Sequence, residues 1–445
     1  MSTALGEVAR SPFARVLLIG GLVLLLQVPS CMIGQLARER QQSRDEATAE
    51  IARTWGAGQH LAGPFLAVPY RIRGVNKKGE KIDLETGTVV ILPERLEVRS
   101  QATVETLRRG LFEVPVYRAR LSVSGRFRAP QNEIGTLVPR EALLWNEAQL
   151  VLRLSDVHAI DRVAPLRWAG AAHEFQGGGG LLCENGLHAP LPAVTAGVPA
   201  EFSIELAIRG SEGLYFSPAA RETQATLESN WPHPKFGGSW LPERREVGGE
   251  GFTAAWAVTS IARGLPSVWK KGTVSEETLN ATRFGAEFLY PVDPYRMSER
   301  TLKYDLLFVG LTFVAVWLSE LLARRPVHPV QYLMLGAALC LFYLLELSLA
   351  EHLGFATAYL IAATAVTLQV SLYARSALHG VRPALVLMAA VAGLYALLYL
   401  LLREEDYALL VGSGSLFVVL SLVMFLTRRV QWTRSGEALS GQVPS

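Results

Sequence analysis

Three residues near the middle of the chain could coordinate a metal ion. Asp156, His158 and Asp161 place one imidazole between two carboxylates. Zinc sites in proteins use repeated Cys and His ligands at short, fixed spacings. This stretch lacks such a spacing, so we interpret the three residues as part of a strand end and its surface loop. The sequence predicts no metal ligand.

A second stretch carries a hydroxyl and an imidazole close together. Ser229 and His233 could belong to a nucleophilic site, in which a base activates the serine. Pro232 and Pro234 make the segment rigid and turn-like, and Trp231 is suited to fill the core. The chain has no Gly-x-Ser-x-Gly turn, His-Glu-x-x-His pair or phosphate-binding loop. We therefore expect no catalytic residue, no cofactor and no enzymatic activity.

Ionisable residues inside apolar segments are costly, so each one needs an explanation. Glu320 lies four residues before Arg324, and an ion pair near a membrane surface explains it. Glu346 lies about two helical turns before the outer end of its predicted helix. For Glu346 we expect either a protonated carboxyl group or a polar contact with a neighbour such as a tyrosine hydroxyl.

Glu351 and His352 follow at the connection between two apolar segments. A histidine has an ordinary pKa of about 6.5, so beside a carboxylate it could sense acid stress. Alternatively, Gly354 permits a tight turn and the polar pair satisfies carbonyl groups at a helix end. Together with Glu346, these two residues are the candidate functional residues of the chain.

Membrane helices must position these residues, because the sequence contains six apolar segments of spanning length. A helix needs about 20 apolar residues to cross a bilayer. The segments cover residues 16–36, 306–322, 330–350, 355–374, 383–402 and 408–427. The last five are predicted to form a bundle over residues 304–427, and their short connections make consecutive helices antiparallel.

Basic residues in the short connections predict the orientation, since they gather on the cytoplasmic side. Seven fall on one side and one on the other. The seven are Arg324, Arg325, Arg375, Arg382, Arg428, Arg429 and Arg434, and the one is Arg403. Six spans then place both termini, residues 1–15 and 428–445, in the cytoplasm. Residues 37–303 lie outside it, which in a bacterium is the periplasm.

The N-terminal segment has an alternative interpretation as a cleaved signal. Val28, Pro29, Ser30 and Cys31 resemble a lipoprotein cleavage site that follows an apolar run. Pro29 is unfavourable at that position, and the apolar run continues beyond Cys31. We therefore favour an uncleaved anchor, continued outward by a polar helix over residues 38–55.

Beyond this helix the pattern changes to the period-two alternation of half-buried strands. Apolar and polar residues alternate in stretches that begin at Tyr117, Phe202 and Phe252, and clusters rich in Gly separate such stretches. We predict a large, mostly β extracytoplasmic domain with an N-terminal helix. Its architecture is expected to be antiparallel and sandwich-like, in one or two units.

Composition narrows the possible partners. The 43 Lys and Arg residues against 40 Asp and Glu give a net charge of +3, which does not favour nucleic acid. Cys31, Cys183 and Cys340 form no disulfide framework or metal-ligand pair that can be read from the sequence. The expected partners are the lipid bilayer and an unknown periplasmic or envelope component.

Many short stretches, in the same order along most of the chain, resemble the CreD family of bacterial inner-membrane proteins of cell-envelope integrity. Towards the C-terminus they are residues 328–332 (HPVQY), 341–345 (LFYLL), 351–352 (EH), 354–355 (GF), 405–410 (EDYALL) and 427–429 (TRR). In the outer domain they include residues 63–65 (GPF), 68–70 (VPY), 109–111 (RGL), 114–117 (VPVY), 209–212 (RGSE), 229–234 (SNWPHP), 291–293 (PVD) and 298–300 (SER). Glu346 departs from the family's pattern, which has an apolar residue there.

The resemblance implies a nonenzymatic protein of the envelope-stress response, functionally linked to a two-component sensor kinase and response regulator. We favour this class, with an outer domain that binds or scaffolds a periplasmic component. The alternative is a membrane transporter, for which broken helices, inverted repeats or buried charges on several helices are expected. A periplasmic enzyme is the third class and requires a catalytic cluster in a pocket.

Overall fold

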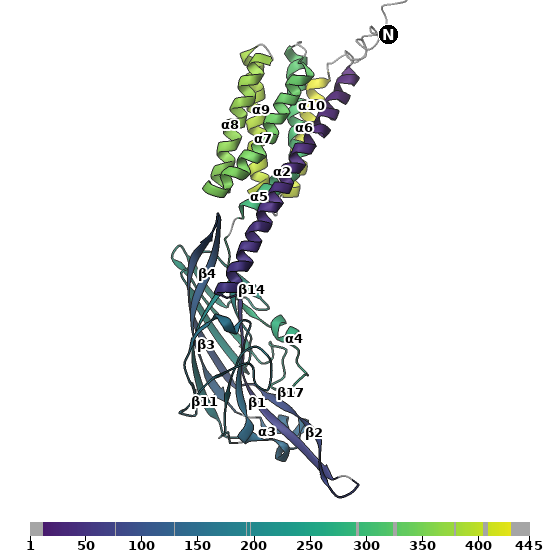
Figure 1. The fold of residues 1–445 in the computed structure, drawn as a ribbon. Helices are drawn as coiled ribbons and strands as arrows, with labels where there is room; N and C mark the ends of the chain where they lie inside the picture. Colours follow the sequence, from purple (N-terminus) through teal and green to yellow (C-terminus); the bar gives the residue numbers. More distant parts are fainter. Residues whose placement is uncertain are drawn as a thin grey trace, which may run out of the picture. The chain divides into compact units, whose positions relative to one another are not determined.

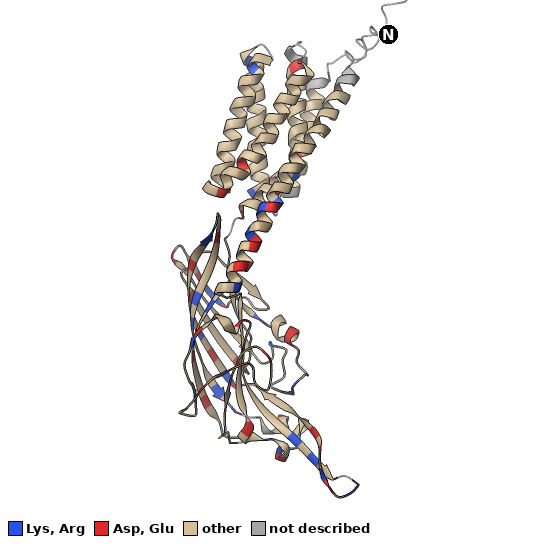
Figure 2. Cartoon of the chain, in the orientation of Figure 1, with Lys and Arg blue, Asp and Glu red and all other residues tan. Residues whose placement is uncertain are grey.

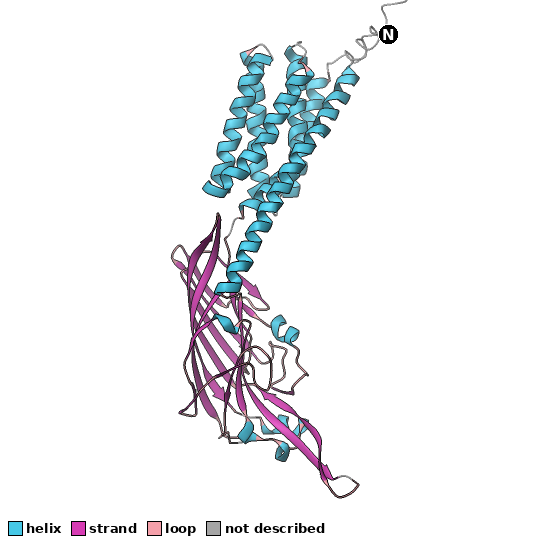
Figure 3. Cartoon of the chain, in the orientation of Figure 1, coloured by secondary structure: helices cyan, strands magenta, loops and turns pink. Residues whose placement is uncertain are grey.

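The computed structural model describes residues 12–428, apart from residues 76, 129, 193, 196, 291–292, 324–326, 378–379 and 404–407. The chain forms two compact units. The β unit comprises residues 44–291, and the helical unit comprises residues 1–43 together with 292–445. Strands make up most of the first unit and long helices the second (Figure 3).

Helix α2 (Pro12–Trp55) is 44 residues long and belongs to both units (Figure 1). At 1.5 Å per residue it is about 66 Å long, roughly twice the thickness of a hydrocarbon core. Its first half is apolar, whereas its second half carries the charged residues coloured in Figure 2. The anchor and the polar helix predicted from the sequence are therefore one continuous element. Near its end, Ile51 packs against Val114 and Val116.

Two nine-stranded sheets form the described part of the β unit. The first sheet contains β1 (Gln59–Val75), β2 (Lys81–Ile91), β5 (Gln149–Leu154), β9 (Gln176–Gly177), β10 (Leu187–Pro190), β12 (Gly213–Phe216), β14 (Pro234–Gly238), β17 (Val268–Lys270) and β18 (Phe284–Phe288). The second contains β3 (Arg95–Arg109), β4 (Phe112–Phe127), β6 (Ile160–Val163), β7 (Leu166–Trp168), β8 (Ala171–His173), β11 (Ala200–Ser211), β13 (Glu222–Ser229), β15 (Arg244–Gly248) and β16 (Gly251–Thr259).

The stretches in which the sequence predicts alternation are three strands of the second sheet. Strands β4, β11 and β16 bury Tyr117, Phe202 and Phe252, followed in each case by every second residue. Because successive side chains of a strand point to opposite faces, this pattern places the apolar residues on one face of the sheet. The prediction of half-buried strands here is confirmed.

The prediction of an antiparallel architecture is wrong in two places, because both sheets are mixed. Strand β13 runs parallel to β3, and the start of β1 runs parallel to β12. Strands β3 and β4 are joined by a tight turn at Gly110, with a φ of 60°, so they must be antiparallel. Strand β13 reaches β3 through a long connection, which allows either direction.

The two sheets share one hydrophobic core, so residues 44–291 form a single unit. Tyr117 and Trp256 of the second sheet contact Phe288 and Phe284 of the first, with ring centroids 5.0 and 5.6 Å apart. This packing is sandwich-like. The unit also contains helices α3 (Gln131–Leu137) and α4 (Glu276–Ala281) and the single turns η1 (Arg140–Ala142), η2 (Trp145–Glu147) and η3 (Val157–Ala159).

The helical unit continues after the β unit. Its helices are α5 (Pro294–Lys303), α6 (Asp305–Ala323), α7 (Pro329–Leu353), α8 (Phe355–Ala377), α9 (Val381–Arg403) and α10 (Ala408–Thr427). Among the described residues, α2, α7, α8 and α9 are long and apolar enough to span a membrane. Helices α5 and α6 pass the same test only as a pair bent by 51°, and the apolar part of α10 is shorter.

Six spanning helices are therefore not confirmed, since the described residues give four, or five with the bent pair. The break between them falls at Tyr304, where the polar helix α5 ends and the apolar helix α6 follows. The predicted orientation stays a prediction. Arg324, Arg325, Arg429 and Arg434, four of the residues on which it depends, lie outside the described residues.

Candidate functional site

Glu346, on α7, has a completely buried side chain, with 0% of its surface exposed. The hydroxyl oxygen of Ser298, on α5, lies 2.8 Å from Oε1 of Glu346. The other carboxyl oxygen, Oε2, has no hydrogen-bond partner in the described part of the chain. A polar contact was expected from the sequence, and it exists. Its partner is a serine of α5 instead of a tyrosine.

The N-terminus of α5 fixes the position of Ser298. Asp293 caps the helix by accepting a hydrogen bond of 3.0 Å from the main-chain N–H of Tyr295, and Pro294 occupies the first turn, where no N–H is needed. Tyr295 and Ser298 are three residues apart, so they share one buried face of the helix. The Ser298 hydroxyl also lies 3.0 Å from the carbonyl oxygen of Pro294. Its single proton therefore has two possible acceptors.

Glu351 receives contacts from both α5 and α2. The hydroxyl of Tyr295 donates a hydrogen bond of 3.2 Å to Oε1 of Glu351, and Nε of Arg40 lies 3.7 Å from the same oxygen. The Glu351 side chain is only 12% exposed. His352 is exposed and joins no hydrogen bond or ion pair among the described residues. Gly354, with a φ of 75°, ends α7 as a tight turn requires.

Asp305, which the sequence analysis did not single out, is the second deeply buried carboxyl group of the helical unit. It is the first residue of α6 and is 2% exposed. Nε2 of Gln27, on α2, donates a hydrogen bond of 3.0 Å to Oδ2 of Asp305, whereas Oδ1 has no partner among the residues described. The available signal was an acidic residue directly before an apolar segment, at the start of the predicted bundle.

Tyrosines from three helices lie near the two carboxyl groups. Tyr343, on α7, and Tyr395, on α9, have buried hydroxyl groups without a hydrogen-bond partner within the described structure. Tyr359, on α8, donates a hydrogen bond of 2.8 Å to the main-chain carbonyl of Tyr395. Tyr343 is close enough to Asp305, and Tyr359 to Glu346, for electrostatic interaction. The interior of the helical unit is thus polar around both carboxyl groups.

No described Lys, Arg or His forms an ion pair with Glu346 or Asp305. A third buried carboxyl group, Glu320, has a different environment. Oε2 of Glu320 accepts a hydrogen bond of 3.0 Å from the hydroxyl of Tyr332. Arg324, with which a pair was predicted, lies outside the described residues. In the described part of the chain, the polar contacts of Glu346 and Asp305 are therefore with uncharged groups.

The residues considered for metal binding belong to a surface turn of the β unit. Asp156 accepts a hydrogen bond of 3.0 Å from the main-chain N–H of His158, and the His158 side chain is 95% exposed. Asp161 pairs with Arg209, at 2.7 Å between charged atoms. Within the described residues, no group of three or more His, Cys, Asp or Glu could hold a metal ion.

The Ser229 to His233 stretch holds a tryptophan in place. The Ser229 hydroxyl accepts a hydrogen bond of 3.3 Å from the main-chain N–H of Trp231, and Trp231 Nε1 donates one of 3.1 Å to the carbonyl of His233. The Trp231 ring is buried and lies against Tyr290, with centroids 5.3 Å apart. The role of this tryptophan in the core agrees with the interpretation made from the sequence.

A Ser-His-Asn arrangement that the sequence did not reveal lies where β1 begins. Nε2 of His60 is 2.8 Å from Oγ of Ser217, and Nδ1 is 3.0 Å from Oδ1 of Asn280. These contacts resemble a nucleophile, a base and an orienting amide. Ser217 is buried, however, and its hydroxyl also lies 3.3 Å from the carbonyl of Leu279. Burial lowers the pKa of His60 to about 4. We assign this cluster a structural role that ties α4 to the first sheet.

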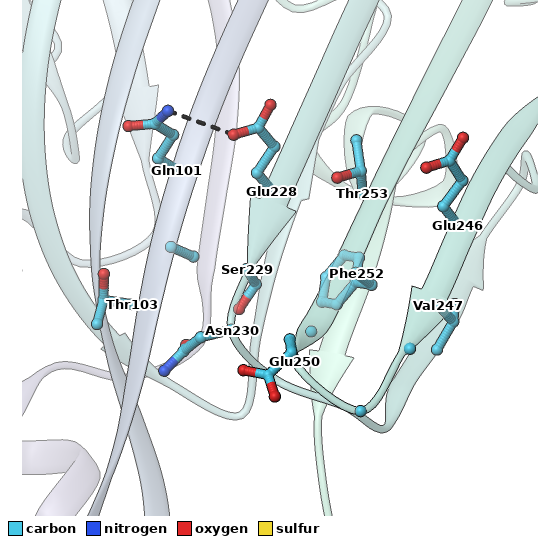
Figure 4. A pocket seen from close by; sticks show the side chains of 14 residues that line it. Gln101, Thr103, Glu228, Ser229, Asn230, Glu246, Val247, Glu250, Phe252 and Thr253 are labelled. Atoms are coloured by element: carbon cyan, nitrogen blue, oxygen red, sulfur yellow. Dashed lines mark hydrogen bonds between the residues drawn. The ribbon is translucent and has the colours of Figure 1, made fainter.

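An open pocket of about 730 Å³ lies on the second sheet, between strands β3, β13, β15 and β16 (Figure 4). Its lining includes three glutamates, Glu228, Glu246 and Glu250. Nε2 of Gln101 donates a hydrogen bond of 3.3 Å to Glu228, which leaves the other two carboxylates turned to the pocket surface. The three glutamates make the pocket acidic.

Comparison with known proteins covers both units. The family model described as "Inner membrane protein CreD" matches residues 11–433. The Escherichia coli (strain K12) protein named inner membrane protein CreD is 31% identical over 418 residues, which cover 93% of this chain and 92% of that protein. The apolar helices described above agree with a location in the inner membrane. The chain belongs to the CreD family of inner membrane proteins.

Proposed function

We propose that this protein is a nonenzymatic component of the cell envelope, with an extracytoplasmic β unit that binds or scaffolds an envelope partner. The helical unit anchors the chain in the inner membrane and responds to the β unit. The chain passes between the two units twice, first within α2 and again just before α5. The proposal rests on what these two helices contact.

Both linking helices bear side chains that hold buried carboxyl groups of the helical unit. The contacts are those of Gln27 with Asp305, Arg40 and Tyr295 with Glu351, and Ser298 with Glu346. A change in the β unit that moves either helix therefore changes hydrogen bonding at these carboxyl groups. Such coupling suits a factor that reports the state of the envelope, and it requires no catalysis.

The envelope role and the functional link to a two-component sensor kinase and response regulator are supported by membership of the family. We take the acidic pocket of Figure 4 as the candidate contact surface of the β unit for a partner. Positions within it are suitable for a crosslinking probe. Thr253 lines the pocket and is exposed. Glu277, on α4, is exposed and outside the pocket, and so provides a matched control.

The proposal is tested by placing a photo-crosslinking amino acid at Thr253 or Glu277 in intact cells. We expect a specific adduct from Thr253 and none from Glu277, and we expect loss of the protein to sensitise cells to envelope stress without abolishing uptake of one nutrient. The adduct is identified by mass spectrometry. Equal labelling from both positions, together with unchanged stress resistance, would contradict the proposal.

A transporter is the second candidate, and one observation favours it. Carboxyl groups are buried on two helices, Asp305 on α6 and Glu346 on α7, as transport sites in membranes often require. Reconstitution in liposomes separates the two candidates. If the purified chain moves a defined solute down its gradient, the transporter replaces the envelope factor.

A further inference from the structure

Two carboxyl groups on adjoining helices of the helical unit lack a balancing charge. Glu346 is 0% exposed and Asp305 is 2% exposed. Each has one oxygen that accepts a hydrogen bond and one that has no partner among the described residues. An ionised carboxylate in such a low-dielectric site is strongly disfavoured unless a cation pairs with it. The protonated, uncharged form is therefore the more stable form of each group.

Among the described residues, the side chains that interact with these two carboxyl groups are uncharged at neutral pH. They are Gln27 and Ser30 of α2, Ser298 of α5, Cys340 and Tyr343 of α7, Tyr359 of α8 and Tyr395 of α9. The ion pair of Arg40 with Glu351 lies five residues further along α7, which is about 7.5 Å of helix. Nothing described near Glu346 stabilises its anion except the single hydroxyl of Ser298.

The Ser298 hydroxyl gives an independent reason to expect a bound proton. Its oxygen lies 2.8 Å from Oε1 of Glu346 and 3.0 Å from the carbonyl oxygen of Pro294. One hydroxyl proton satisfies only one of these acceptors at a time. If Glu346 carries a proton, it donates to Ser298, and Ser298 donates to Pro294. Both short distances are then hydrogen bonds, whereas an ionised Glu346 must compete with Pro294 for the same proton.

A metal cation fits the site less well than a proton does. Hard cations take about six oxygen ligands. Around Glu346, the described residues provide one carboxyl group and one serine hydroxyl at hydrogen-bond distance, and no group of three or more acidic, His or Cys residues gathers within the described chain. The Glu346 carboxyl group and the Ser298 hydroxyl group are therefore better suited to exchanging a proton than to binding a metal cation.

We propose that Glu346 is a proton-binding site within the membrane-spanning part of the chain, with Asp305 as a second protonatable group. The proton arrives as hydronium at the end of α7 where Glu351 and His352 lie. It forms an O–H bond with the Glu346 carboxylate, and water is released. Tyr295 and Ser298, on one face of α5, connect that end of α7 to Glu346. This proposal goes beyond the envelope function and does not depend on the identity of a partner.

Infrared difference spectroscopy of the purified full chain in lipid nanodiscs, between acid and alkaline pH, tests the proposal. We expect a C=O stretching band of a buried carboxylic acid that is lost at alkaline pH and shifts in D₂O. Glu346→Gln removes this band, and Asp305→Asn removes a second one. Glu320→Gln provides the matched control, because Glu320 is also buried but accepts a hydrogen bond from Tyr332, and it leaves both bands in place.

A band that persists unchanged in folded Glu346→Gln protein overturns the proposal, and so does a band that sodium ions remove at constant pH, since the site then binds a metal cation. Size-exclusion chromatography and circular dichroism verify folding. If Glu346→Gln does not fold, Ser298→Ala keeps the carboxyl group and removes its hydroxyl partner. The acid band must then shift in frequency, and an unshifted band counts against Glu346 as its source.

Discussion

At the scale of single residues, the buried site joins Glu346 of α7 to Ser298 of α5 through a contact of 2.8 Å. Glu346 was recognisable because a carboxyl group inside an apolar segment is rare and costly. Ser298 was not, because a serine in a polar stretch carries no signal until the fold brings α5 against α7. Asp305 was missed for a related reason, since it stands just outside an apolar run and only the structure shows it buried. Contacts between residues that are distant in the sequence become visible only once the helices are packed together.

The His60 cluster leads to a prediction about pH and stability. Burial lowers the pKa of His60 from 6.5 to about 4, so the folded protein holds this imidazole neutral. The unfolded chain binds a proton at about pH 6.5, which means that stability is complete above that pH and is lost as the pH falls towards 4. The loss amounts to about 3 kcal/mol for His60 alone. Tryptophan fluorescence during thermal unfolding at several pH values measures it.

Substitution separates His60 from other groups that titrate in acid. His60→Gln stays uncharged, so its unfolding temperature should fall less than that of the wild type between neutral pH and about pH 4.5. His158→Gln is the control, because that side chain is 95% exposed and should leave the pH dependence unchanged. An identical pH dependence in wild type and His60→Gln would show that His60 does not carry the effect.

At the scale of elements, alternation located three strands of the second sheet and apolar length located the long helices α2, α7, α8 and α9, whereas the pairing of strands was not predicted. Strands β4, β11 and β16 were visible because a half-buried strand repeats every second residue. The parallel pairing of β13 with β3 had no local signal, since their directions are set by a connection of more than a hundred residues. The bend between α5 and α6 depends on tertiary packing in the same way.

The packing of α2 on α7 leads to a second prediction. Gly336 allows the close approach, because a Cβ there would overlap Leu26 and Phe313. Ser30 Oγ lies 3.6 Å from Sγ of Cys340, so a thiol at position 30 meets the native one. We expect Ser30→Cys to form a disulfide with Cys340 on mild oxidation, in a background without Cys31 and Cys183. Mass mapping of proteolytic fragments detects the bond.

Two further variants serve as controls for the crosslink between Ser30→Cys and Cys340. Met32→Cys lies on the exposed side of α2 and should not crosslink to Cys340. Gly336→Leu should reduce the Ser30→Cys crosslink several-fold, because the larger side chain separates the helices. Equal crosslinking from positions 30 and 32 would mean that α2 does not present a fixed face to α7.

At the scale of the whole molecule, hydropathy and composition predicted a membrane protein with a large β unit, and the fold and the family agree. The number of spans was harder to predict from the sequence. Length and apolarity define a span only when the helix is straight and isolated, and here one candidate is bent and another is short. Composition could not predict what the β unit binds under the proposed function, because binding depends on a few side chains that the fold brings together.

The orientation leads to a prediction at this scale. The count of seven basic residues against one predicts that both termini are cytoplasmic and that the β unit is outside. A phosphatase that is active only outside the cytoplasm should therefore be active when fused after residue 120 and inactive when fused after residue 440. Colony assays with matched expression levels measure both fusions, and the opposite pattern would reverse the orientation.

Pro29 stands inside α2, where it removes one main-chain hydrogen bond and crowds a carbonyl group of the preceding turn. The hydrogen-bond ladder of a helix resists twisting and stretching, so a mechanical load on α2 yields first where the ladder is interrupted. Gln27 and Ser30 lie close to Pro29 in the sequence, and they contact Asp305 and Cys340, respectively. We therefore expect α2 to bend first at Pro29, beside these buried polar contacts.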